Sequence, residues 1–250
     1  MIVGEDDHQL AARLAQEAGV LLLDLRAEAV AAGAHPWQVM DEGDMRAHHF
    51  IVRGLQEARP GDAILSEEGR DSQNRLSANR VWIVDPLDGT NEFGEPGRPD
   101  WAVHVALVIE GHPVAAAVAL PALGRTFCTQ PAPVVPEPAG RGPRVVTSRR
   151  RSPQAAVIAA QVLGADVIRV GSAGAKAMAV VMGHADVYAH HGGMYEWDSA
   201  APAAVAAAAG LHVSRIDGSP LVYNNPDPWL PDLLVCRREM AEPILNALWG

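Results

Sequence analysis

The sequence predicts a mixed α and β fold built in two parts. Short β-branched runs alternate with segments of helical periodicity along the whole chain, and a proline-rich stretch divides the chain near its middle. The 250 residues suffice for one large domain or two small ones. With 48% hydrophobic and 20% charged residues, the chain can bury a sizeable core.

The chain is predicted to begin with two helices. Residues 6–31 form a long amphipathic helix, because leucine and alanine recur there at helical spacing. Asp44 can cap a second helix, in which Phe50, Ile51 and Leu55 face the core.

Strands are predicted to follow. β-Branched runs between turn residues indicate strands at 63–67 and 81–84. The segments 102–109 and 114–120, separated by a Gly-His-Pro turn, indicate a hairpin, and 125–129 could add another strand.

Residues 131–143 contain five prolines and little that could pack, which is typical of a connector. We therefore expect an N-terminal α+β subdomain at 1–130, carrying most of the acidic motif residues, and a C-terminal α/β subdomain at 144–250. In the second part the predicted strands are 144–148, 167–170, 186–189, 211–214 and 233–236, and the predicted helices start at 153, 172, 198 and 239.

Composition limits the classes of binding partner and the cellular compartment that we expect. The net charge is −10 without a long basic stripe, which argues against nucleic-acid polymers and anionic membranes. The acidic N-terminus lacks the basic region of a secretory signal, and the apolar stretches near 177–182 and 200–209 are too short to span a bilayer. Cys128 and Cys236 are expected to be buried thiols in a reducing compartment, so we expect a cytoplasmic protein.

The run Val84-Asp85-Pro86-Leu87-Asp88-Gly89-Thr90 is the most informative stretch of the chain. It places two carboxylates three residues apart, directly after an apolar strand that Pro86 is expected to end. Two acidic ligands at a rigid strand-to-loop corner suit a hard cation such as magnesium. Alone, the run could also be an ordinary Asp-Pro turn.

Two further acidic clusters lie at predicted element ends. Glu67 and Glu68 end a strand, and Asp198 begins an alanine-rich helix, where it could equally be a plain N-cap. Neighbouring strand residues point to opposite faces, so Glu67 is expected to be a ligand and Glu68 to lie further out. Together the three clusters predict one shared metal site.

These motifs make the chain resemble the inositol monophosphatase family of magnesium-dependent, lithium-sensitive phosphatases. The resemblance rests on Glu67-Glu68, on the run from Asp85 to Thr90 and on Trp197-Asp198-Ser199-Ala200-Ala201, and it covers nearly the whole chain. It implies a five-layered α/β/α/β/α sandwich of the inositol monophosphatase and fructose-1,6-bisphosphatase type, with the active site between the two halves. It leaves a homodimer open.

The resemblance also implies two or three Mg²⁺ ions per site and inhibition by Li⁺. Glu67, Asp85 and the main-chain carbonyl of Leu87 would bind the first ion, and Asp85, Asp88 and Asp198 the second. Magnesium clamps phosphoryl oxygens and lowers the pKa of bound water, which a slow phosphate-ester hydrolysis requires.

Catalytic and substrate roles follow in the same way from the resemblance. Thr90 and Glu67 would orient the attacking water, and Asp44 would support Thr90. The substrate would meet Asp88, Gly89, Thr90, Gly171, Ser172, Lys176 and Asp198. Lys176 lies one residue later than the usual family spacing.

The leaving group is indicated by residues outside these motifs. Asn91-Glu92-Phe93 and the segment 218–224 resemble the CysQ branch of the family, and above all its actinobacterial members. His191 stands where inositol-specific enzymes carry an acidic ring-binding residue. This branch removes the 3′-phosphate of 3′-phosphoadenosine 5′-phosphate, a by-product of sulfate assimilation.

Alternatives stay open. An inositol-1-phosphatase or fructose-1,6-bisphosphatase activity would use the same metal motifs, and a non-catalytic nucleotide sensor would keep the fold alone. Arg149, Lys176 and the pair Tyr223-Asn224 are candidates to meet the nucleotide. Residues 37–43 lack the Lys and Thr usual in the family, so the first substrate-side loop departs from the family pattern.

Overall fold

Two five-stranded sheets organise the chain. The computed structural model describes residues 5–138, 140–150 and 152–249. The first sheet has the order β1-β2-β3-β4-β5, with β1 parallel to β2 and the other neighbours antiparallel. Its strands are β1 (Ala63–Ser66), β2 (Arg80–Asp88), β3 (Ala102–Ile109), β4 (His112–Leu120) and β5 (Arg125–Cys128).

The second sheet has the order β7-β6-β8-β10-β9. The strand β6 is parallel to both of its neighbours, β7 and β8, and β10 is antiparallel to β8 and β9. Its strands are β6 (Arg144–Ser148), β7 (Asp166–Val170), β8 (Val187–Tyr195), β9 (His212–Ser214) and β10 (Trp229–Cys236).

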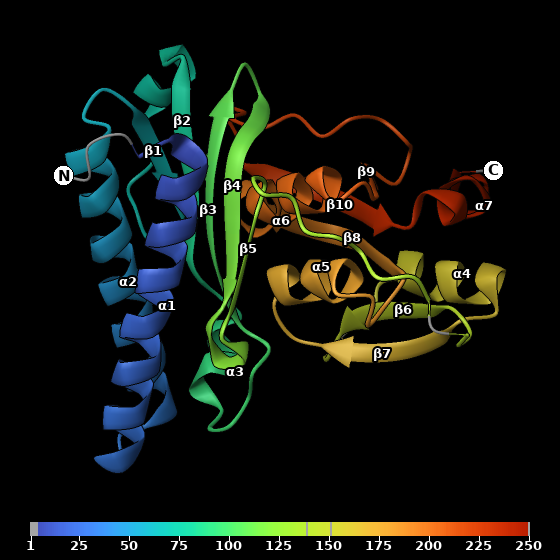
Figure 1. Cartoon of the computed structure of the whole chain (residues 1–250), viewed down its shortest axis with the longest axis horizontal. Helices are drawn as coiled ribbons and strands as arrows, with labels where there is room; N and C mark the ends of the chain where they lie inside the picture. Colours follow the sequence, from blue (N-terminus) through green and yellow to red (C-terminus); the bar gives the residue numbers. More distant parts are fainter. Residues whose placement is uncertain (1–4, 139, 151, 250) are drawn as a thin grey trace.

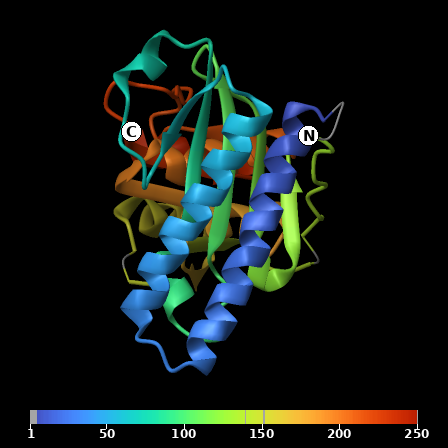
Figure 2. The ribbon, with the colours of Figure 1, turned by 90° about the vertical axis from the view of Figure 1, so that its left-hand side faces the viewer.

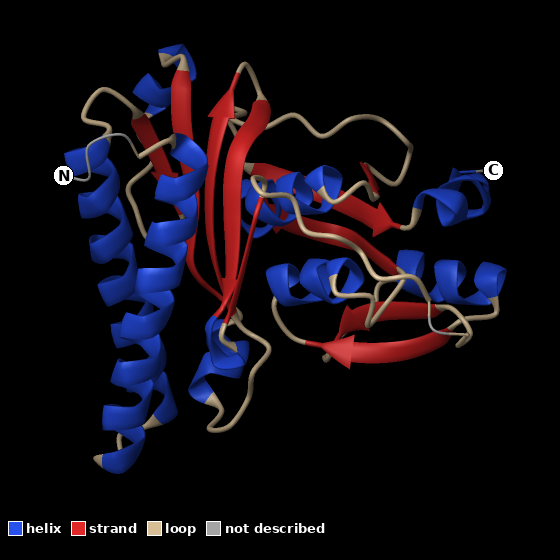
Figure 3. Ribbon diagram, in the orientation of Figure 1, coloured by secondary structure: helices blue, strands red, loops and turns tan. Residues whose placement is uncertain are grey.

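Helices form the remaining layers of a five-layered sandwich (Figures 1 and 3). Two long helices cover the outer face of the first sheet (Figure 2), two lie between the sheets, and two cover the outer face of the second. In that order they are α1 (Asp7–Ala31), α2 (Pro36–Ala58), α5 (Ala173–Val181), α6 (Glu196–Ala208), α4 (Gln154–Leu163) and α7 (Arg238–Trp249). The short α3 (Thr90–Gly94) follows β2. The predicted layer order is thus confirmed.

None of the described helices combines the length and the apolar character needed to cross a bilayer.

Both sheets are apolar on both faces, which explains why each needs two helical covers. On β2, Trp82 and Val84 pack against α1 and α2, whereas Val81 and Ile83 face the middle layer. This alternation follows from the two-residue repeat of a strand.

A single middle core joins the two halves. It contains Val118 of the first sheet, Met178 and Val205 of the middle helices, and Val235 of the second sheet, all buried. The subdomain division at residues 131–143 remains a prediction, since each half contributes one sheet but neither encloses this core alone. The connector is itself anchored, because Arg141 donates to the Asp186 carboxylate over 2.6 Å.

The predicted start of the second helix was wrong. The helix α2 begins at Pro36, with His35 as its N-cap, and Asp44 lies inside it. Proline fits the first helical position because its missing N–H has no intrahelical partner there. Residues 37–43 are therefore helical and form no loop.

The expectation that Pro86 ends the strand was also wrong. The strand β2 runs on to Asp88, and its pairing with β3 is irregular between Asp85 and Asp88. Proline is tolerated where the ladder is interrupted, because no N–H is needed there. This irregularity places both aspartates on the side of the middle layer.

Candidate active site

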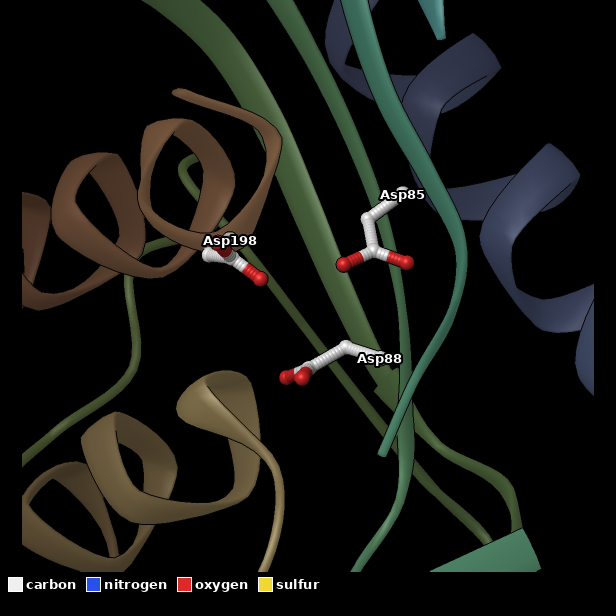
Figure 4. Close-up of side chains that lie close together, drawn as sticks. All are labelled: Asp85, Asp88 and Asp198. Atoms are coloured by element: carbon white, nitrogen blue, oxygen red, sulfur yellow. The ribbon is translucent and has the colours of Figure 1, made fainter. Parts of the chain in front are cut away.

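Three aspartate carboxylates meet between the two sheets (Figure 4). Asp85 and Asp88 come from the end of β2, and Asp198 comes from the first turn of α6. One oxygen atom of each lies within 4.8 Å of those of the other two. Asp85 and Asp88 are buried and Asp198 is half-buried. The structure therefore brings together three of the predicted metal ligands from both halves of the chain.

A tight corner follows Asp85. Its carboxylate accepts a hydrogen bond from the Leu87 N–H over 3.1 Å, and the Thr90 hydroxyl donates to the Leu87 carbonyl over 3.2 Å. Gly89 has φ +87°, and an added Cβ would lie 3.0 Å from the Cβ of Ser172. A side chain there would be both strained and crowded. The corner thus places Thr90 two residues after Asp88, at the start of the short helix that follows β2.

Asp88 is held by the N-terminus of α5. The Ser172 hydroxyl donates to it, as do the N–H groups of Ala173 at 3.1 Å and Gly174 at 2.6 Å. The unpaired N–H groups at a helix start stabilise a carboxylate in this position. Ser172, predicted to contact substrate, therefore already engages a predicted metal ligand.

The neighbouring Gly171 is equally constrained. Its N–H donates to the Asp100 carboxylate over 2.6 Å, and an added Cβ would lie 2.3 Å from the Cγ of Glu92. A side chain at this position would displace Glu92, which lies far away in the sequence.

Asp198 accepts a hydrogen bond from the Tyr195 N–H over 2.6 Å. Tyr195 is the N-cap of α6, and Asp198 is the third helical residue. Asp198 reaches back to the helix start instead of acting as the N-cap, which leaves its carboxylate facing Asp85 and Asp88 (Figure 4).

Glu67 and Asp44 approach the cluster from β1 and α2. Glu67 directly follows β1 and stays accessible to solvent, and its N–H donates to the Val84 carbonyl over 3.3 Å. Asp44 is half-buried inside α2. The Thr90 hydroxyl bonds to Leu87 in the described structure, so the predicted support of Thr90 by Asp44 remains a prediction.

Crowding of negative charge dominates the electrostatics. Loss of solvent together with the charges of Glu68 and Glu67 raises the pKa of Asp44 to about 8. Partial desolvation of its carboxylate, followed by the charges of Glu68 and Asp88, raises the pKa of Glu67 to about 7.

The carboxyl groups of Asp85 and Asp198 follow the same trend. Burial raises the pKa of Asp198 to about 7, with Asp88 adding to the effect. Complete burial, reinforced by the charges of Glu67, Asp88 and Asp198, holds the pKa of Asp85 well above its ordinary value. Of the described residues, only His104 comes within ion-pair distance of Asp85 or Asp88, and no Lys or Arg does. This donor set fits a divalent cation, which would supply the missing positive charge.

The candidates for nucleotide recognition are all engaged within the protein. Lys176 is buried, and its ammonium donates to the carbonyls of Gly171 at 3.2 Å and Ser172 at 2.5 Å. Arg149 pairs with Glu92 at 2.8 Å and Glu95 at 3.0 Å. The Tyr223 hydroxyl donates to Ser199, and Asn224 exchanges hydrogen bonds with Arg75. The predicted nucleotide pocket remains a prediction.

Sequence reasoning missed His104 and Asp100. His104 is fully buried, and burial lowers its pKa. Asp100 is buried and anchors Gly171. The available signal for His104 was one polar side chain inside the apolar run 102–109.

Comparison with known proteins places this geometry in a wider context. The profile of the inositol monophosphatase family matches residues 6–249. The chain is 51% identical over 240 residues to the 3′-phosphoadenosine 5′-phosphate phosphatase of Mycobacterium tuberculosis, which covers 93% of this chain and 89% of the relative. It is 33% identical over 198 residues to the 3′(2′),5′-bisphosphate nucleotidase CysQ of Escherichia coli, covering 75% of this chain and 80% of the relative.

A solved structure shows the same similarity in three dimensions. The crystal structure of CysQ from Bacteroides thetaiotaomicron superimposes with a TM-score of 0.76 at 26% identity. The match covers 95% of this chain and 99% of the other.

The raised carboxylate pKa values lead to a prediction about stability. Without metal, Asp44, Glu67 and Asp198 keep their protons up to about pH 7–8 in the folded protein but only to about pH 4 in the unfolded chain. The contribution of these three carboxyl groups to the free energy of unfolding of the metal-free protein should therefore fall as pH rises from about 4 to 8. Metal binding requires deprotonated ligands, so the rise in Tm on adding MgCl₂ should be larger at pH 8 than at pH 6.

Thermal unfolding at both pH values, with EDTA or MgCl₂, measures this difference. The Asp44→Asn variant should flatten the pH dependence of the metal-free protein. A magnesium-induced rise in Tm that is the same at both pH values would contradict the prediction.

Proposed function

The chain belongs to the inositol monophosphatase family, and on that premise we propose that it is a magnesium-dependent phosphatase acting on 3′-phosphoadenosine 5′-phosphate. The observation that carries the phosphatase chemistry is the convergence of Asp85, Asp88 and Asp198 beside the corner at Gly89-Thr90. The similarity to the mycobacterial phosphatase supports removal of the 3′-phosphate as the reaction.

We assign the metal ligands from the residues that converge. Asp85, Asp88 and Asp198 would hold two or three Mg²⁺ ions together with Glu67 and the Leu87 carbonyl. When bound, these ions supply neutralisation of the phosphoryl oxygens and a water molecule of lowered pKa. Two observations support this assignment. The pKa values of Asp85 and Asp198 are raised. Within the described residues, no Lys or Arg forms an ion pair with Asp85 or Asp88.

The protein's own groups then position the reactants. The Thr90 hydroxyl and the Glu67 carboxylate orient the water, and the main-chain N–H groups of Gly89 and Thr90 hold the phosphate. Asp44 would support Thr90, and burial together with the charges of Glu68 and Glu67 favours its protonated form. Gly171 and Ser172 act on the phosphate side by fixing Asp88 and the adjoining turn.

The 5′-phosphate and adenine provide binding energy remote from the reacting centre. Arg149 keeps 25% of its side chain exposed, whereas Lys176 and Tyr223 are buried. We propose that Arg149 contacts the 5′-phosphate while its pairs with Glu92 and Glu95 keep it oriented. Inositol 1-phosphate and fructose 1,6-bisphosphate remain alternative substrates, because the metal cluster acts on the ester and not on the leaving group.

The metal assignment predicts loss of activity in Asp85→Asn. This change keeps the volume of the side chain but removes charge from the ligand that faces both other aspartates. Turnover should fall by at least about a thousandfold, a loss typical of removing a group central to the chemistry. EDTA should abolish activity of the native enzyme and MgCl₂ should restore it. Asp24→Asn, on the exposed face of α1, is the control and should be fully active.

Lithium provides a separate test of the same site. The family resemblance predicts inhibition at millimolar or lower LiCl when magnesium is below saturation. Rates should be compared with those in equal NaCl, which controls for ionic strength. Equal inhibition by LiCl and NaCl would contradict the prediction that the enzyme is sensitive to lithium.

The substrate assignment predicts different effects for two substitutions. Thr90→Ala should lower kcat/KM for 3′-phosphoadenosine 5′-phosphate and inositol 1-phosphate alike, because orientation of water is common to both. Arg149→Ala should lower it selectively for the nucleotide by about ten- to hundredfold, the effect of one lost charge-assisted hydrogen bond. Arg150→Ala is the matched control, since Arg150 is exposed next to it.

Phosphate release from 3′-phosphoadenosine 5′-phosphate, inositol 1-phosphate and fructose 1,6-bisphosphate should be measured side by side. A native enzyme that prefers inositol 1-phosphate would contradict the nucleotide assignment and leave the phosphatase chemistry intact. A protein that binds the nucleotide and magnesium without hydrolysing the nucleotide would favour the alternative of a non-catalytic nucleotide sensor.

A further inference from the structure

A buried histidine contacts the segments that carry or hold the clustered aspartates. His104 lies on β3 directly opposite Asp85 in the pairing with β2, and its side chain is fully buried. Its Nδ1 lies 3.0 Å from the carbonyl oxygen of Trp197, the residue before Asp198. Its Nε2 lies 3.3 Å from Oδ2 of Asp88. One ring therefore reaches both the end of β2 and the first turn of α6.

The hydrogen bond to Trp197 fixes the orientation of the ring. A carbonyl oxygen only accepts hydrogen bonds, so Nδ1 of His104 carries the proton and donates it. This bond links the first sheet to the turn that carries Asp198. An apolar side chain of similar size would fill the space but leave the Trp197 carbonyl without this donor.

The helix α5 is the third segment that His104 contacts, after β2 and α6. An added Cβ at Gly174 would lie 2.0 Å from Nε2 of His104, so the helix backbone packs directly on the ring. The N–H of the same Gly174 donates to Asp88 over 2.6 Å. The imidazole thus determines how closely α5, and with it the group that holds Asp88, approaches the first sheet.

We propose that His104 is a positioning residue for the metal site, which sets the spacing between Asp88 and Asp198 and thereby the affinity for Mg²⁺. The identity of the ion rests on the proposed function. The spacing itself rests on the contacts of His104 with Trp197, Asp88 and Gly174. Groups that orient metal ligands typically change metal affinity by about 10- to 100-fold when they are removed.

Two substitutions separate the hydrogen bond from the volume of the ring. His104→Leu keeps comparable volume and removes the donor to Trp197. His104→Asn keeps an amide donor near the position of Nδ1. Binding of MgCl₂ and MnCl₂ to the metal-free protein by calorimetry is the primary measurement, with Tm and the KM for 3′-phosphoadenosine 5′-phosphate at saturating magnesium alongside.

We expect His104→Leu to weaken metal binding by about 10- to 100-fold with little change in KM, and His104→Asn to retain most of the affinity. Val108→Ala is the control, because Val108 is buried in the middle core on the same strand, away from the aspartates. It should lower Tm without changing metal affinity. Native metal affinity in His104→Leu, or an equal loss in Val108→Ala, would overturn the proposal.

A double substitution tests the spacing even if His104→Leu fails to fold. Gly174→Ala alone should weaken metal binding, because its Cβ would collide with the ring. In the His104→Asn background, where the side chain is shorter, the same change should weaken binding much less. Equal effects in both backgrounds would overturn the proposal.

The measurement separates this inference from the proposed function. A native protein that binds magnesium but does not hydrolyse the nucleotide would contradict the proposed substrate and leave the role of His104 standing. A native protein that binds neither metal ion would overturn both.

Discussion

The close approach of three like-charged carboxylates is the constraint on which the rest of this structure depends. Asp85, Asp88 and Asp198 bring oxygen atoms within 4.8 Å of one another in a largely buried place. Such carboxylates repel each other and lose their solvation, which raises the pKa of Asp85 and Asp198. A fold can hold this arrangement only when stability gained elsewhere offsets it, a cost typical of functional sites.

The surrounding structure meets the constraint with main-chain donors instead of cationic side chains. Asp85 accepts from its own turn, Asp88 from the start of α5 and Asp198 from the start of α6. The buried ammonium of Lys176 donates to the carbonyls of Gly171 and Ser172. Each aspartate is therefore oriented, while the charge that would neutralise the cluster is left for a bound ion to supply.

The two halves of the chain are interdependent for the same reason. The middle layer of α5 and α6 packs against both sheets and also carries the groups that complete the site. Close approach is possible because Gly89, Gly171 and Gly174 offer no side chain where segments distant in sequence touch. Packing and chemistry thus use one interface, so the core that stabilises the protein also sets the geometry of the aspartates.

Local periodicity in the sequence determined most strands and helices, and motifs at element ends indicated the acidic residues that converge. The layer order came from the resemblance of those motifs to a known family. The sequence did not determine that β2 continues past Pro86 or that Asp44 lies inside α2, since pairing with β3 and proline at the first helical position decide those points. Only the tertiary structure could show that Ser172 holds Asp88, that Lys176 is buried, and that His104 joins β3 to α6. The contact of Ser172 with Asp88 joins residues 84 positions apart, and that of His104 with Trp197 joins residues 93 positions apart. The burial of Lys176 places a charge against main-chain carbonyls. Local periodicity carries no information about long-range contacts or about the burial of a charge.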